Sequence, residues 1–373
     1  MWSNLPFDVL ANIFSFLSPD SLARARSACK NWNLCSKTCY SFNLSASRPH
    51  SNHQPWFLGL PIRNQKPCCY AHNPVLNNWY ELSLEFLPVP VRAVSPIGSL
   101  LLLKVSHSTT LQLAICNPFS RQFRYLPQLN ISRTNPAVGV VVLNQGVQFP
   151  SFRIYVAGGM SEATQGGGAT YERTTEMYDS QLDEWRIVGS MPVEFAVRLT
   201  VWTPNESVRI ENVLYWITSA RVYSVIGFDI ATNTWEELSV PMAEMLEFAT
   251  LVRRNGVLGL VGGTSGGDAC IWEMKEGKIW GLKNKVPGEL GWKLLGGNKR
   301  NWDGTKCVGN DGAICLYRDL GSGMVAWRKV RDESSEWEWN WVEGCDCIKG
   351  KKVHRCSIRG MLIHPSLAST CIF

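Results

Sequence analysis

A strand–turn–strand pattern recurs through most of this 373-residue chain and limits its fold more than any other feature. Each unit has a short apolar segment, a polar turn and a second segment that an aromatic residue opens; for example, Ile226–Asp229 leads through a Thr-Asn turn to Trp235. The aromatic residues at this position are Trp79, Phe123, Trp185, Trp235 and Trp280, and the sixth unit ends in Trp337, Trp339 and Trp341. Repeats of this kind bury a continuous core only when neighbouring units stack on one another.

The length of the repeat indicates the architecture. The aromatic positions lie about 50 residues apart, which is the size of one blade of a β-propeller. Six units fill residues 56–342, and the first has only three candidate strands. The spare strand Ser357–Pro365 could complete that unit and close the ring, which removes exposed sheet edges. We therefore predict a mainly β fold with a closed propeller over residues 56–373. Six blades are favoured, and seven are the alternative because Phe123 and Trp185 are about 60 residues apart.

Residues 1–44 have a different texture, with apolar residues three and four positions apart, as in a helix. Ser18-Pro19-Asp20 is expected to end one helix and begin another, since Ser can cap, Pro suits the first helical position and Asp complements the positive helix end. Two or three short helices in about 40 residues bury too little apolar surface to be stable alone, so this domain is expected to need a partner. Residues 45–55 are polar and contain proline, which is typical of a linker.

Composition excludes several classes of protein. The 13 cysteines come without a secretory signal, so we expect reduced thiols and a location in the cytoplasm, the nucleus or both. The apolar runs are too short to span a bilayer, and the net charge of +6 is mild, so neither a membrane nor a nucleic acid is expected as a partner. The six histidines lie in no catalytic motif, and Cys345-x-Cys347 with His354-x-Cys356 lacks the spacing of a zinc finger. No catalytic residue, metal or cofactor is therefore predicted.

The N-terminal residues carry a family resemblance. Residues 4–42 resemble an F-box through Leu5-Pro6-Phe7-Asp8-Val9-Leu10, Ile13-Phe14-Ser15-Phe16-Leu17 and Cys29-Lys30-Asn31-Trp32. The repeats resemble degenerate kelch repeats, with Gly-Gly pairs at Gly158-Gly159 and Gly262-Gly263 in only some of them. The whole chain is thus similar to plant F-box/kelch-repeat proteins.

This resemblance implies the substrate-recognition subunit of an SCF-type ubiquitin ligase, itself not an enzyme. The F-box would dock on a Skp-family adaptor, and through it on a cullin ligase core, while the propeller would hold a target protein for ubiquitination and proteasomal degradation. The F-box residues that carry over by position are Leu5, Pro6, Ile13, Phe14, Leu17, Leu22, Cys29 and Trp32. The alternative is a propeller scaffold that binds partners without their degradation.

Strand parity predicts which propeller face would bind the target. In a four-stranded meander, the loops between the second and third strands and the connections between blades emerge on the same face, and recognition residues often lie on such loops. On that face, Lys299, Arg300 and Trp302 combine cationic and aromatic side chains. We therefore predict them as substrate contacts.

Overall fold

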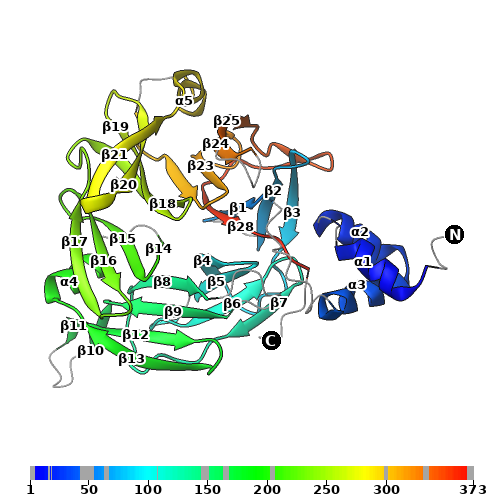
Figure 1. The fold of residues 1–373 in the computed structure, drawn as a ribbon, viewed down its shortest axis with the longest axis horizontal. Helices are drawn as coiled ribbons and strands as arrows, with labels where there is room; N and C mark the ends of the chain where they lie inside the picture. Colours follow the sequence, from blue (N-terminus) through cyan, green and yellow to red (C-terminus); the bar gives the residue numbers. More distant parts are fainter. Residues whose placement is uncertain are drawn as a thin grey trace.

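A computed structural model places six four-stranded antiparallel sheets around a ring, with a small helical module at its rim (Figure 1). The described residues are 5–15, 17, 19–42, 54–62, 67–106, 108–143, 151–162, 168–201, 206–297, 301–330 and 336–367. This arrangement confirms the predicted mainly β fold and the favoured number of six blades.

Each blade is one sheet, whose strands follow one another from the innermost outward. The first blade consists of β28 (Ile358–Ile363), β1 (Trp56–Pro61), β2 (Cys68–Asn73) and β3 (Asn78–Ser83). The second consists of β4 (Val91–Ile97), β5 (Leu100–Val105), β6 (Leu113–Asn117) and β7 (Gln122–Tyr125). The third consists of β8 (Ala137–Val142), β9 (Phe152–Ala157), β12 (Thr174–Asp179) and β13 (Glu184–Ser190). The fourth consists of β14 (Val208–Ile210), β15 (Val213–Ser219), β16 (Tyr223–Asp229) and β17 (Thr234–Ser239). The fifth consists of β18 (Leu246–Arg254), β19 (Val257–Thr264), β20 (Ala269–Lys275) and β21 (Ile279–Lys285). The sixth consists of β22 (Lys306–Gly309), β23 (Ala313–Tyr317), β24 (Met324–Lys329) and β25 (Trp337–Val342).

The ring is closed by a strand from the far end of the sequence. β28 pairs antiparallel with β1 along its whole length, from Trp56 opposite Ile363 to Pro61 opposite Ile358. It also contacts β22 and β4, the innermost strands of the two neighbouring blades. The first blade therefore has four strands like the others, and β28 covers the edge of β1 that would otherwise be unpaired.

The long interval between Phe123 and Trp185 is filled by an insertion and does not form a seventh blade. β10 (Met160–Glu162) pairs with β11 (Ala169–Tyr171) in a hairpin between β9 and β12, which projects from the ring in Figure 1. A second small hairpin, β26 (Cys347–Ile348) with β27 (Lys351–Lys352), lies between β25 and β28.

The repeated aromatic residues pack between sheets, as the apolar character of the repeat requires. Trp235 stacks on Phe228 with ring centroids 4.5 Å apart and on Trp216 at 6.1 Å. Phe228 in turn meets Tyr155 of the preceding blade. Burying such large side chains supplies much of the stability of the fold and fixes each blade against its neighbour.

The helices lie outside the ring. α1 (Phe7–Ser15), α2 (Pro19–Ala28) and α3 (Lys30–Phe42) form the N-terminal module, while α4 (Val193–Val201) and α5 (Gly288–Leu294) lie in connections between blades. Within the described segments, no helix is long and apolar enough to cross a membrane.

Candidate protein-binding surfaces

The helical module has its own small core. The apolar side chains buried in it, among the described residues, are Leu10, Ala11, Phe14, Leu22, Ala25 and Cys35. Phe14 of α1 meets the edge of Trp32 of α3 at a centroid distance of 5.4 Å, which joins the first helix to the third. The core residues of α1 follow the three- and four-residue spacing of a helix that presents one face to its neighbours.

The eight F-box positions predicted from the sequence divide by depth. Phe14 and Leu22 are buried core residues, whereas Leu5, Ile13, Leu17 and Trp32 are half-buried around that core. Pro6 and Cys29 are exposed. The structure thus brings these residues into one module. The exposed and half-buried ones are accessible to a partner, whereas Phe14 and Leu22 are not.

The module also has exposed apolar side chains at positions that were not predicted as adaptor contacts. Phe7 and Val9 of α1 are 41% and 40% exposed, and Leu34 of α3 is 58% exposed. The sequence analysis did not include them among the adaptor-binding residues. They could have been identified as apolar residues of α1 and α3 that do not belong to the buried core. These three side chains are therefore accessible to a partner of the module.

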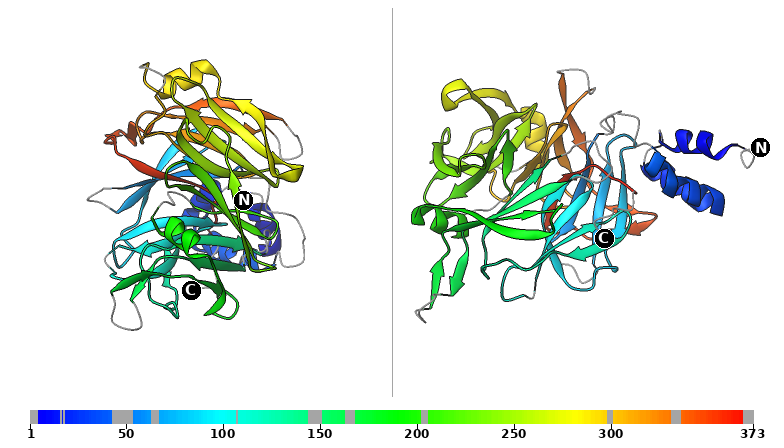
Figure 2. Two further views of the ribbon diagram at one scale, coloured as in Figure 1. Left: turned by 90° about the vertical axis from the view of Figure 1, so that its left-hand side faces the viewer. Right: turned by 60° about the horizontal axis from the view of Figure 1, so that its bottom comes forward.

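The helical module is attached to the propeller through the segment that follows β28. The Arg26 guanidinium donates a hydrogen bond to the Leu367 carbonyl oxygen at 2.9 Å, and the Leu367 side chain packs against the module core. The Asn117 amide of the second blade donates to the Ser366 carbonyl oxygen at 3.1 Å. Figure 2 shows the module beside the ring, away from its centre, so it leaves the ring opening uncovered.

The propeller has a cavity at the centre of one face. This is the face that carries the loops between second and third strands and the connections between blades, and we call it the connection face. The cavity has a volume of about 1150 Å³ and is lined by the beginnings of innermost strands, including β4, β18, β22 and β28. Among the described residues, its charged lining residues are Arg92, Glu206, Lys306 and Arg359.

The charged groups of the cavity are brought together from distant parts of the sequence. An Nη2 nitrogen of Arg359 lies 3.3 Å from the Glu206 carboxylate and donates to the Val94 carbonyl oxygen at 3.0 Å. Burial raises the pKa of Glu206, and the Arg359 charge opposes that rise. Burial lowers the pKa of Lys306, and Arg359 lowers it further while Asp319 acts in the opposite direction.

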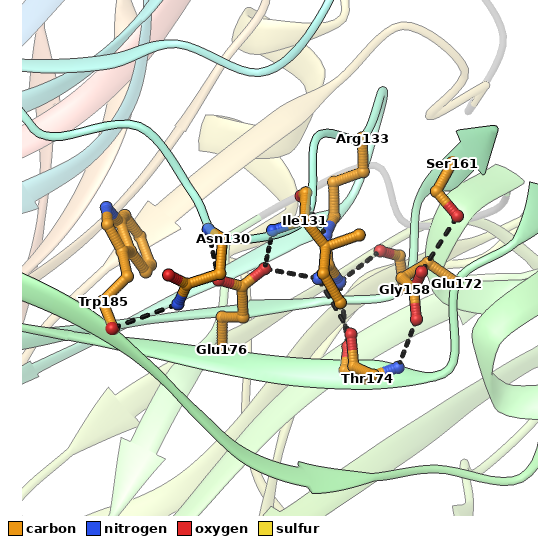
Figure 3. Close-up of polar contacts among 9 residues, drawn as sticks. All are labelled: Asn130, Ile131, Arg133, Gly158, Ser161, Glu172, Thr174, Glu176 and Trp185. Carbon is orange, nitrogen blue, oxygen red and sulfur yellow. Dashed lines mark hydrogen bonds and ion pairs between the residues drawn. The ribbon is translucent and has the colours of Figure 1, made fainter. Parts of the chain in front are cut away.

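A buried ion pair holds one of the connections of this face in place (Figure 3). Arg133 Nη2 lies 2.6 Å from Glu176 Oε1, and both side chains are 0% exposed. The guanidinium also donates to the carbonyl oxygens of Gly158 and Thr174. Glu176 accepts hydrogen bonds from the backbone N–H groups of Asn130 at 2.8 Å and Ile131 at 3.1 Å. The connection between the second and third blades is therefore fixed to β12 by a satisfied polar network.

The three predicted substrate contacts have different outcomes in the structure. Lys299 and Arg300 lie outside the described residues. Trp302 is only 2% exposed, its ring lies 6.0 Å from Phe248, and its Nε1–H donates to the Gly267 carbonyl oxygen at 2.9 Å. The indole is thus enclosed by the fifth blade, and the role of these residues in substrate contact stays a prediction.

Comparison with known proteins gives two family-model matches. Residues 2–41 match the F-box-like model and residues 153–192 match the Kelch motif model. The first match spans α1 to α3, and the second spans β9 to β13 of the third blade.

Three proteins of Arabidopsis thaliana are among the relatives. F-box only protein 6 is 22% identical over 98% of this chain and 74% of its own length. An F-box/kelch-repeat protein is 27% identical over 77% of this chain and 73% of its own length. SKP1-interacting partner 15 is 34% identical over 34% of this chain and 38% of its own length.

Proposed function

We propose that this protein is the substrate-recognition subunit of an SCF-type ubiquitin ligase. It has an F-box-like region and a kelch motif, and its homologues are Arabidopsis F-box/kelch-repeat proteins. The observation that carries this proposal is the pairing of a folded F-box-like module with a closed six-bladed propeller in one chain. A subunit of this kind binds two proteins and performs no covalent chemistry itself.

The F-box-like module would dock on a Skp-family adaptor and through it on a cullin ligase core. Support comes from the relative named SKP1-interacting partner 15 and from the exposed apolar side chains of α1 and α3. Phe7, Val9 and Leu34 would lie in this interface together with Pro6 and the half-buried predicted positions. Burial of a few central apolar side chains is what dominates the affinity of such interfaces.

The propeller would hold the target protein on its connection face, and the target would be ubiquitinated and degraded by the proteasome. The module lies at the rim of the ring, so adaptor and target could bind at the same time (Figure 2). We propose that this takes place in the cytoplasm, the nucleus or both.

The adaptor interaction is tested by co-purification of the full chain with a plant Skp-family adaptor. The test variant is Phe7→Asp/Leu34→Asp, because both side chains are exposed and a change there leaves the module core intact. The matched control is Leu182→Asp, an equally exposed apolar residue (54%) in the third blade. The wild-type chain and the control should retain the adaptor, and the double variant should lose it, since a carboxylate is costly to bury without a partner.

Two outcomes would contradict the proposal. If the wild-type chain binds no adaptor, the SCF assignment is wrong and a propeller scaffold becomes the better explanation. If adaptor binds but proteins trapped on the propeller do not accumulate when the proteasome is inhibited, the degradative role is wrong.

A further inference from the structure

The cavity on the connection face has an uneven distribution of charge. Lys306 is the first residue of β22, Arg359 the second of β28 and Arg92 the second of β4. β28 contacts both β22 and β4, so three neighbouring innermost strands each contribute one cation at the same end. We call Lys306, Arg359 and Arg92 the cationic arc; all three line the cavity.

Among the described residues, a carboxylate neutralises only one member of the cationic arc. Arg359 pairs with Glu206, which precedes β14. The Lys306 ammonium donates to the Ile358 carbonyl oxygen at 2.7 Å and to the Ser357 hydroxyl at 3.0 Å, both neutral acceptors. In the part of the chain that the structure describes, no carboxylate lies within ion-pair distance of Lys306 or Arg92. Asp319 is close enough to raise the pKa of Lys306 but makes no ion pair with it, so neither cation has a carboxylate in direct contact.

The surroundings strengthen the field of these charges. Burial lowers the pKa of Lys104 and of Lys306, and a neighbouring cation lowers each further: Arg92 acts on Lys104 and Arg359 on Lys306. Each pair of cations is therefore close enough to repel. Much of the remaining wall is apolar, for example Leu87, Val89 and Leu251. A concave site with walls of low dielectric constant focuses the field of its charges and attracts ions of opposite sign.

We propose that this cavity binds an acidic segment of a partner protein, with the carboxylates of the segment received by Arg92 and Lys306. The inference rests on the proposed function and deepens it, because it assigns a chemical class to the target. A peptide segment fits better than a small metabolite, since the cavity of about 1150 Å³ exceeds the usual volume of small-molecule sites, roughly 300–1,000 Å³, and opens among the loops of the connection face. Arg359 is paired with Glu206, so it is not assigned a carboxylate of the segment.

The test measures binding of fluorescein-labelled deca-glutamate to the full chain by fluorescence anisotropy. The variants are Arg92→Gln, whose side chain is exposed, and Arg92→Gln/Lys306→Gln. The matched control, Arg121→Gln/Lys275→Gln, removes the same charges from exposed positions at β6–β7 and β20–β21, turns between third and fourth strands on the opposite face. Deca-glutamine and citrate are the neutral and small-anion probes.

Deca-glutamate should bind the wild-type chain with an affinity that falls as salt rises, and the double cavity variant should bind at least tenfold more weakly. The single variant should lie between them, the control within about twofold of wild type, and deca-glutamine should not bind. No binding of deca-glutamate, or equal binding by the cavity and control variants, would overturn the inference. Binding of citrate but not of the peptide would also overturn it, because the site would then serve a small anion.

Adaptor co-purification on the same preparations separates the two proposals. If the wild-type chain retains the adaptor but does not bind deca-glutamate, only the cavity inference fails. If the adaptor is lost from the wild-type chain, the proposed function fails whatever the peptide does.

Discussion

Substitution of Glu176 by glutamine should destabilise the propeller strongly, although the two side chains have nearly the same shape. Glu176 and Arg133 are both 0% exposed, and the carboxylate accepts from two backbone N–H groups as well as from the guanidinium. Glutamine keeps one acceptor oxygen but turns an NH₂ donor toward groups that also donate. It also leaves the buried Arg133 charge without its ion-pair partner, and breaking a buried pair in this way typically costs about 3–5 kcal/mol.

Thermal unfolding followed by tryptophan fluorescence measures this loss. At roughly 2 °C for each kcal/mol in a domain of this size, the Glu176→Gln variant should melt about 6–10 °C below wild type. The control is Glu184→Gln on the adjacent strand β13, where the ion pair with Arg186 is half-exposed and contributes about 1 kcal/mol or less. Adding Arg133→Met to Glu176→Gln should cost less than the sum of the two single changes, because the pair is lost only once. If Glu176→Gln lowers the melting temperature no more than Glu184→Gln does, the buried pair does not stabilise the connection.

Two further predictions concern the first blade and the closure of the ring. Burial, and after it the charge of Arg328, lowers the pKa of His72 from 6.5 to about 4, so the unfolded chain takes up a proton first as the pH falls. The free energy of unfolding should therefore drop by about 3 kcal/mol between pH 7 and pH 4. His72→Gln should flatten that part of a urea-denaturation pH profile, and an unchanged slope would show that another group is responsible. Gly360→Ala in β28 would place a Cβ 2.6 Å from the Phe57 ring and 2.7 Å from the Tyr317 ring, so it should lower the free energy of unfolding by about 1–3 kcal/mol and favour opening of the propeller. A protease should then cleave the variant faster than wild type under native conditions, and an unchanged cleavage rate would contradict tight packing at this position.

The sequence predicts the blades well because the repeat is local. The turn between the third and fourth strands of a blade lies within a few residues of the aromatic marker, as in β16 and β17 around Trp235. The same pattern could not decide the blade number over the interval before Trp185, because an insertion such as the β10–β11 hairpin lengthens a repeat without adding a sheet. The helices α4 and α5 were not predicted; each lies in a connection between blades, outside the repeated strand–turn–strand pattern.

The candidate sites depend on packing between distant residues and were less predictable. An aromatic residue beside cations resembles a surface contact in the sequence, yet Trp302 is enclosed against Phe248. Arg92, Lys306 and Arg359 meet only because the ring places β22, β28 and β4 side by side. No local pattern marks such a cluster. The F-box positions followed a contiguous motif, which is why their place in one module was predictable while their individual exposure was not.

The pairing of β28 with β1 also sets an order of events during synthesis. Trp56 leaves the ribosome about 300 residues before its partner Ile363, an interval of about 15–60 s at the usual rate of translation. Throughout that time the helices of the N-terminal module are available to fold, whereas the inner edge of β1 has no partner and is open to wrong pairing. A nascent chain of this kind would benefit from a chaperone until β28 emerges, and a premature stop just before residue 358 would leave five complete blades beside one that cannot close.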